Sequence, residues 1–145
     1  MSTYATVGGY IVYAEKKDFE SAVSLLGSFV DSEGYFLDEM GERIGETAGA
    51  DASDLTIIFP LALQRNLASM LLNLFVGGKG TVVWTTTDCN FQGGVIVNGE
   101  ETLYDLTEWA EENDIGESPA PDPKDAENWN EYSQEIEQEF FAEFL

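Results

Sequence analysis

Strand-like and helix-like patterns of hydrophobic and polar residues follow one another along the N-terminal half of this chain. Residues 3–14 are rich in β-branched and aromatic side chains and predict a first strand, with an internal Gly-Gly pair as a bulge or bend. Residues 16–30 carry apolar side chains at spacings of three and four, which predicts a first helix. Residues 33–38 are compatible with a short second strand, whereas residues 39–53 show no period and predict a loop.

A proline separates the next two apolar segments. Residues 54–59 form a compact apolar run, which predicts a buried third strand. Pro60 suits the first turn of a helix, where its missing N–H donor costs nothing, so residues 61–75 are predicted to form a second helix. Gly77 and Gly78 would cap the C-terminal end of that helix.

The C-terminal half begins with a predicted hairpin and continues into an acidic helix. Residues 81–87 and 94–97 predict a fourth and a fifth strand, which could pair across residues 88–92. After the turn at Asn98-Gly99, residues 100–113 alternate apolar and acidic positions at helical spacing and predict a third helix.

Three prolines isolate the last segment. Residues 114–124 contain the run Ser-Pro-Ala-Pro-Asp-Pro, which predicts an extended and fairly stiff connector. Residues 125–145 place aromatic and aliphatic side chains at spacings of three and four, which predicts an acidic amphipathic helix. The sequence therefore divides into an α+β body (1–113) that includes the first acidic helix, a proline-rich connector (114–124) and an acidic C-terminal helix (125–145).

The predicted order of elements is β-α-β followed by β-α-β, with one additional hairpin strand. This order predicts an α+β fold, namely a ferredoxin-like, or split βαβ, sandwich with an added β-hairpin strand and two acidic C-terminal helices. In topology, residues 3–98 resemble the ferredoxin-like domains found in small plasmid and phage proteins.

The charge of the chain is far from that of an ordinary domain. The 145 residues include 28 acids and 6 bases, for a formal net charge of −22, whereas a magnitude of about 2 to 8 suffices to keep a small domain soluble. Such self-repulsion favours either a partner with a positive surface or a high-salt environment. The six bases form no cluster, so direct binding of nucleic acid through a basic patch is excluded.

The composition also excludes most kinds of catalytic site. There is no histidine, so a Ser-His-Asp or Cys-His arrangement is impossible, and Cys89 has no second cysteine with which to form a disulfide. No spaced set of acids matches a calcium loop. We therefore expect no enzyme activity, no metal and no cofactor, and the absence of a signal peptide or long apolar run favours a cytoplasmic protein without a membrane span.

Five glutamates of the last helix recur every four residues, which places them about 6 Å apart along one drifting stripe. This glutamate ladder consists of Glu127, Glu131, Glu135, Glu139 and Glu143. Like charges four residues apart destabilise a helix by about 0.2–0.5 kcal/mol per pair, and solvated helix faces usually mix their signs. We infer that the ladder serves a partner, together with the acids Asp105, Glu108, Glu111 and Glu112 of the preceding acidic segment.

In size and charge the chain resembles the small acidic DNA-mimic inhibitors of phages and mobile elements. That resemblance implies an inhibitor that presents carboxylates where phosphates would stand, to a basic nucleic-acid-binding protein such as a nuclease, a CRISPR effector or a DNA-repair enzyme. Residues 100–145 hold sixteen of the 28 acids against a single base, Lys124, so the charge is concentrated there. Adaptation to high salt remains an alternative, although it should spread the charge more evenly.

The aromatic side chains of the last segment support a second hypothesis. Trp129, Phe140 and Phe141 belong to the apolar stripe of the predicted C-terminal helix. Because Phe140 and Phe141 are adjacent, they cannot both face the same surface, and one of them could be an exposed anchor for a partner or a second subunit. The alternative function is thus a small acidic assembly module that forms a homodimer or larger oligomer through this stripe.

Overall fold

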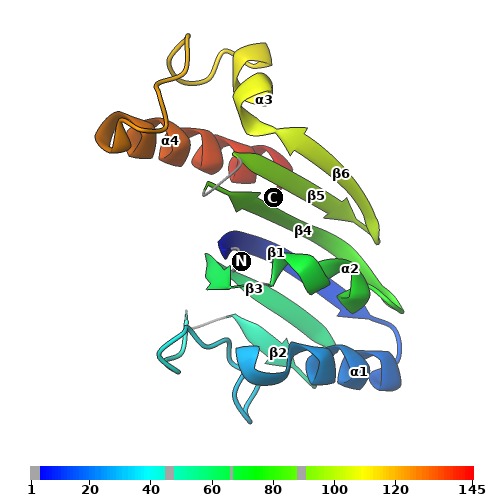
Figure 1. Ribbon diagram of the computed structural model, residues 1–145. Coiled ribbons are helices and arrows are strands. Elements are labelled where there is room, and N and C mark those ends of the chain that lie inside the picture. The colour runs from blue at the N-terminus through cyan, green and yellow to red at the C-terminus, as the bar shows by residue number, and fades with distance from the viewer. Residues whose placement is uncertain (1–3, 45–47, 66, 88–90) are drawn as a thin grey trace.

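A computed structural model describes residues 4–44, 48–65, 67–87 and 91–145 (Figure 1). In chain order the elements are β1 (Tyr4–Tyr13), α1 (Lys16–Leu26), a 3₁₀ turn (Gly27–Phe29), β2 (Gly49–Asp51), β3 (Thr56–Arg65), a second 3₁₀ turn (Ala68–Met70), α2 (Leu71–Leu74), β4 (Gly78–Thr86), β5 (Gln92–Val97), β6 (Glu100–Asp105), α3 (Leu106–Glu112) and α4 (Ala126–Phe144). The predicted mixture of helices and strands is confirmed.

The strands form one antiparallel sheet in the order β2-β3-β1-β4-β5-β6. β1 lies at its centre and pairs with both β3 and β4, and β3 separates β1 from β2. β4, β5 and β6 follow one another as antiparallel neighbours, and the predicted pairing of the fourth and fifth strands is confirmed.

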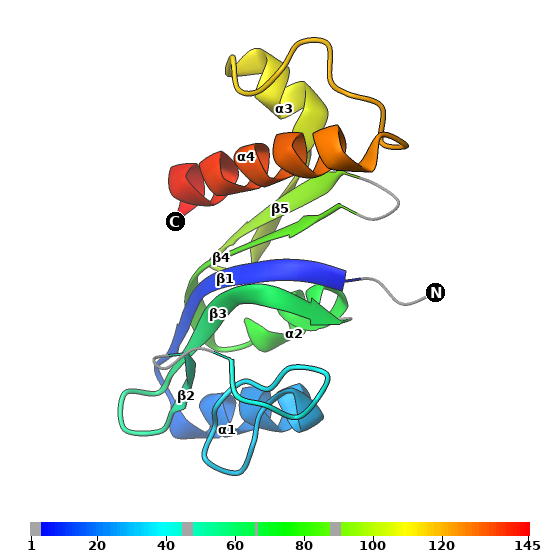
Figure 2. The ribbon, with the colours of Figure 1, turned by 90° about the vertical axis from the view of Figure 1, so that its left-hand side faces the viewer.

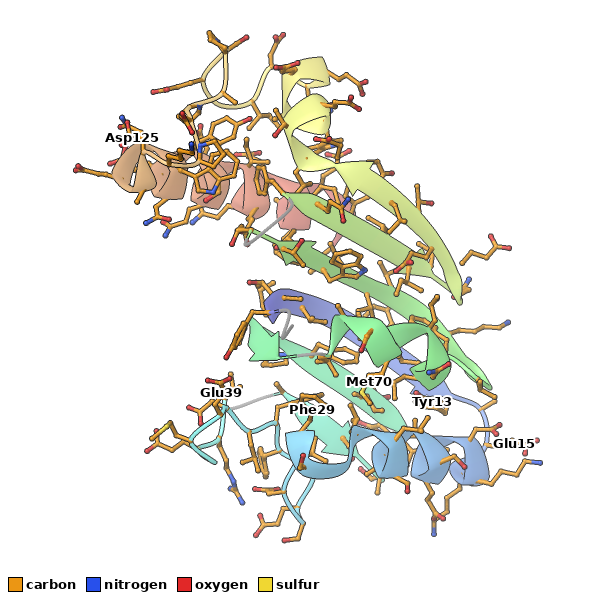
Figure 3. The ribbon with its side chains drawn as sticks, viewed as in Figure 1. Tyr13, Glu15, Phe29, Glu39, Met70 and Asp125 are labelled. Atoms are coloured by element: carbon orange, nitrogen blue, oxygen red, sulfur yellow. The ribbon has the colours of Figure 1, made fainter. Side chains whose placement is uncertain are left out.

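Each face of the sheet has its own hydrophobic core, because successive side chains of a strand point to opposite faces. Val82 belongs to a core that α1 and α2 cover, and Tyr13, Phe29 and Met70 lie between these helices and the sheet (Figure 3). The next residue, Val83, belongs to a second core that is covered by α3 and α4. Figure 2 shows α3 and α4 gathered at one end of the molecule and α1 at the other.

The predicted helix over 61–75 is wrong, because the third strand continues through Pro60. β3 extends to Arg65, and helical turns begin only at Ala68. The pairing of β1 with β3 shifts its register at Gly8, which pairs with Pro60, and Leu61 is the extra residue with a φ of 52°. A β-bulge of this kind tolerates proline inside a sheet, because the N–H that proline lacks is not needed there.

The predicted helix over 100–113 is half wrong. Asn98 and Gly99 both have positive φ, at 51° and 91°, as a tight hairpin turn requires. The turn returns the chain as β6, and only Leu106–Glu112 is helical. Leu103, which the helical pattern would bury, lies on the edge strand and is 67% exposed.

The remaining differences are small. The first helix ends at Leu26, four residues earlier than predicted, and continues as a 3₁₀ turn. Residues 33–38 form only isolated bridges, and the strand β2 lies in the segment predicted to be a loop. Residues 114–124 are non-helical, as predicted, and lead to α4, which packs on the sheet through the second core.

Candidate functional site

The glutamate ladder lies on the outer side of α4. Glu127, Glu131, Glu135, Glu139 and Glu143 are all exposed. Tyr132, Ile136 and Phe140 of the same helix are buried in the second core. The aromatic stripe therefore docks α4 in an orientation that leaves the ladder in solvent.

The ladder is a spiral and not a flat row. Each four-residue step turns the helix by about 400°, so successive glutamates drift by about 40° and the two ends differ by about 160°. Glu131, Glu135 and Glu139 span only about 80° of this drift, which gives the ladder a coherent middle. Glu143, at the end of this drift, lies within about 20° of the direction of the buried Ile136, although its own side chain is exposed.

Basic side chains do not neutralise the ladder. The four ion pairs among the described residues are formed by Lys16, Lys17 and Arg43 with acids of residues 15–33. Within the described part of the chain, no acid from residue 100 onward takes part in an ion pair. The acidic end of the molecule thus keeps its charge for the solvent or for a partner.

The acids of the α3 region are exposed too, but one of them has a structural task. The side chain of Asp105 accepts hydrogen bonds from the backbone N–H groups of Thr107, at 3.0 Å, and Glu108, at 3.2 Å, and so caps α3. Glu108, Glu111 and Glu112 are exposed on the helix itself. α3 and α4 meet through apolar side chains, with the rings of Trp109 and Phe140 5.1 Å apart, so these carboxylates lie outside the contact.

The expectation that Phe140 or Phe141 is exposed is wrong. Phe140 is fully buried and Phe141 is 7% exposed, because α4 lies along the sheet and packs on it through the second core. Trp129 is half-buried, and its ring lies 5.2 Å from that of Phe91. Contact of Phe140 with a partner or a second subunit would require α4 to leave the sheet, whereas Trp129 and the edge of Phe141 keep some exposed surface with α4 in place.

A sixth glutamate of α4 has a different environment. Glu137 is half-buried, and its Oε2 accepts a hydrogen bond of 2.8 Å from the hydroxyl of Thr85, which is fully buried in β4. Burial raises the pKa of the Glu137 carboxyl, and the hydrogen bond from Thr85 opposes that rise. Among the described residues, no cation pairs with this carboxylate.

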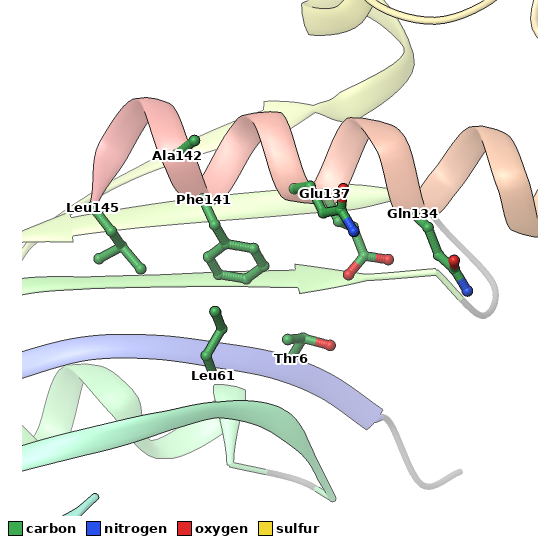
Figure 4. Close-up of a pocket in the computed structure, with 8 residues that line it drawn as sticks. Thr6, Leu61, Gln134, Glu137, Phe141, Ala142 and Leu145 are labelled. Carbon is green, nitrogen blue, oxygen red and sulfur yellow. The ribbon is translucent and has the colours of Figure 1, made fainter. Parts of the chain in front are cut away.

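Glu137 lines a groove between α4 and the sheet (Figure 4). Figure 4 shows Glu137, Phe141 and Leu145 pointing from the helix side toward Thr6 and Leu61 of the sheet. The groove has a volume of about 490 Å³, and Gln134, Gln138 and Ala142 complete its lining. Carboxyl, amide and hydroxyl groups thus meet apolar walls in one concave site.

Neither Glu137 nor the groove is among the features that the sequence predicts. Glu137 falls outside the four-residue ladder and lies four residues after Ser133 and three and four before Phe140 and Phe141, so its position on the apolar side of the helix could have been inferred. Leu61 could not, because its place depends on the bulge opposite Gly8.

The described residues contain no cluster of three or more metal-ligating side chains, and none of their helices is long and apolar enough to cross a membrane. Comparisons of the chain with models of protein families, with curated proteins and with solved structures gave no match.

Proposed function

We propose that this protein is a non-enzymatic, acidic DNA mimic that binds and inhibits a basic nucleic-acid-binding protein. The observation that carries the proposal is the exposed glutamate ladder, which is held on a packed helix and left without counter-charges among the described residues. Fixed carboxylates of this kind can pair with the Lys and Arg side chains that otherwise contact phosphates. Nucleases, CRISPR effectors and DNA-repair enzymes of a phage's host are the partner classes we favour.

The charge density of the ladder favours mimicry of one phosphate backbone over a whole duplex. From Glu127 to Glu143, five charges span about 24 Å of helix axis. One DNA strand carries about seven phosphates over that length and a duplex about fourteen. We therefore expect the ladder to fill a basic groove that follows a single strand, with the acids of α3 contacting the rim.

We also propose that β1 to β4 form a ferredoxin-like unit, to which the hairpin strands β5 and β6 add at one edge. The strand order β2-β3-β1-β4 supports this proposal. The β1-α1-β2 connection passes over β3, and the β3-α2-β4 connection passes over β1, and in each case the strand between is antiparallel to its neighbours. In this view α3 and α4 are additions that cover the face opposite α1 and α2.

The test is a competition assay with purified members of the three partner classes, each bound to a fluorescent oligonucleotide. We expect the protein to displace the oligonucleotide from at least one of them, with an affinity that falls as salt rises. The triple variant Glu131→Gln, Glu135→Gln, Glu139→Gln should weaken displacement at least about tenfold, because it removes the middle of the ladder.

A matched variant separates the ladder from net charge. Replacing Glu39 and Glu42 by Gln and Asp54 by Asn changes the charge equally, from −22 to −19, on exposed positions of the other half of the chain that take part in none of the described ion pairs. This control should displace the oligonucleotide as well as the unmodified protein does. Equal weakening by both triple variants would remove the ladder from the binding site, and no displacement from any class would reject the mimic function.

A further inference from the structure

The groove between α4 and the sheet is built by two local features of the fold. The bulge at Pro60 gives Leu61 its positive φ, which turns an additional apolar side chain toward α4. Gly8 of β1 lies directly beneath two of the lining leucines, because a Cβ at this position would lie 2.7 Å from Cδ1 of Leu61 and 3.1 Å from Cδ1 of Leu145. The missing side chain of Gly8 therefore lets these two leucines lie close to the sheet.

Apolar surface continues from the groove across the half of this sheet face that none of the described helices covers. Tyr10, Val12, Ile58 and Leu61 are between 40% and 53% exposed. α4 covers only the part of the face formed by β4 to β6, so these side chains of β1 and β3 stand beside it. An exposed apolar patch bordered by charged side chains is typical of a protein interface.

The charge of the groove indicates that it binds a cationic group. Glu137 is the only ionisable side chain among the described lining residues, and it is held against Phe141 with one hydrogen bond from Thr85. A half-buried carboxylate without a cation is unfavourable, and a bound cation would relieve this cost. A second copy of this chain is a poor occupant, because each copy carries a net charge of −22.

From this geometry we propose that the groove receives an arginine side chain of the partner protein, flanked there by apolar residues. The aliphatic stem of the arginine lies on Leu61, Phe141 and Leu145, and the guanidinium pairs with Glu137. Arginine suits such a site because it combines an apolar stem with a planar fork of donors, and it is enriched among the residues that dominate interface energies. The groove then supplies a specific anchor, whereas the neighbouring ladder acts through charge alone. This inference rests on the proposed function for the identity of the partner, but not for the chemistry of the groove.

The test uses a blocked peptide of the sequence Leu-Arg-Leu, titrated into the uniformly ¹⁵N-labelled protein. The matched peptide Leu-citrulline-Leu has a neutral side chain of nearly the same shape. We expect saturable shifts of the backbone amides of Gly8, Leu61 and Glu137 with the arginine peptide. Binding of the citrulline peptide should be at least about tenfold weaker, because a charge-assisted pair is lost.

Two variants test the charge of the groove and its available space separately. Glu137→Gln removes the charge and retains an oxygen that can accept from Thr85, so arginine-peptide binding should fall at least about tenfold. Gly8→Ala pushes the flexible ends of Leu61 and Leu145 into the groove and should also weaken binding, while the dispersed amide spectrum shows that the fold is kept. Glu42→Gln, an equal charge change at an exposed position outside both the groove and the ladder, should alter the affinity less than about twofold.

Several outcomes would overturn the proposal. These are equal binding of the citrulline peptide, shifts that follow the ladder and persist in Glu137→Gln, and a dimer whose formation shifts the same amides. The assay contains no nucleic-acid-binding protein, so its result is independent of the competition assay. Saturable binding in the groove without competition would reject the DNA mimic and keep the arginine site, and the reverse result would keep the mimic and reject the site.

Discussion

Two glutamates of α4 that are only two residues apart have opposite environments. Glu139 is exposed on the ladder, whereas Glu137 is half-buried beside Phe141 and accepts a hydrogen bond from Thr85. The difference follows from the helical angle of about 200° between them. A carboxylate on the packed side of a helix has lost part of its hydration, and this loss makes its charge state part of the folding equilibrium.

The raised pKa of Glu137 predicts that the stability of Glu137→Gln, relative to the unmodified protein, increases as the pH rises. In the pH range between the unfolded and the folded pKa, the folded protein binds more protons at this position than the unfolded chain. The free energy of unfolding therefore falls as pH rises through that range, and glutamine removes this loss. Thermal melts across the acidic to neutral range should show Glu137→Gln gaining over the unmodified protein with increasing pH.

Glu139→Gln provides the control for this prediction, because it removes a carboxylate from the same helix on the exposed side. The neutral groups that face Glu137 are Thr6, Thr85, Gln134 and Gln138, and no other ionisable side chain lines the groove among the described residues. A gain for Glu137→Gln that is no larger than that of Glu139→Gln, or that does not grow with pH, would contradict the argument.

At the scale of elements, α3 illustrates how a carboxylate can serve the fold and a surface together. Its seven residues are too few to be stable alone, and its helical form depends on the Asp105 cap and on the burial of Leu106 and Trp109 in the second core. The same Asp105 is one of the acids that the sequence assigned to partner binding.

Replacing Asp105 separates these two tasks. Asp105→Ala leaves the N–H groups of Thr107 and Glu108 without their acceptor and should lower the free energy of unfolding by about 0.5–2 kcal/mol in chemical denaturation. Asp105→Asn keeps an oxygen that can cap the helix and should cost much less. If Asp105→Asn nevertheless weakens displacement of the oligonucleotide, the charge of Asp105 contacts the partner. Equal destabilisation by both substitutions would show that the cap is not what stabilises α3.

The wrong element boundaries share one physical origin, because at both places long-range strand pairing overrides a local signal for a helix. Pro60 followed by apolar residues is a good local start for a helix, yet β1 offers a bulge at Gly8 that accommodates the proline in a strand. Residues 100–105 have helical spacing, yet the Asn98-Gly99 turn brings them back along β5. Strand pairing is non-local, so a single-sequence period cannot show it.

The helical stripe of α4 could be predicted because it is local and long. Nineteen residues repeat the same separation of aromatic and acidic positions, so the helix and its exposed ladder follow from the sequence. The groove depends on α4, on the bulge of β3 and on Gly8 of β1, and only the assembled sheet brings these three together.

For the whole molecule, the distribution of charge bears on the choice between partner binding and salt adaptation. Residues 100–145 carry sixteen acids against one base, and the remaining twelve acids share residues 1–99 with five bases. The four ion pairs among the described residues lie in the less acidic part. This asymmetry favours the proposed partner binding over salt adaptation, which should spread the charge more evenly.

Salt should therefore stabilise the protein without being required for folding. We expect a cooperative thermal melt in dilute buffer, because two hydrophobic cores of aromatic and aliphatic side chains support the sheet. The melting temperature should rise toward 1 M NaCl, where the screening length falls to about 3 Å and like charges no longer repel along α4. Loss of structure below molar salt would instead favour the salt-adapted module.

The two triple variants show whether this repulsion is concentrated in the ladder. Both carry a net charge of −19, which is −22 plus three neutralised acids. Only the ladder variant removes all four like-charge pairs at four-residue spacing, so it should melt at a higher temperature than the control in dilute buffer. The difference in melting temperature between the two variants should disappear in 1 M NaCl, because salt screens the repulsion that the ladder variant removes. If the two variants respond equally at every salt concentration, the ladder carries no local penalty, and the main physical reason for assigning it to a partner disappears.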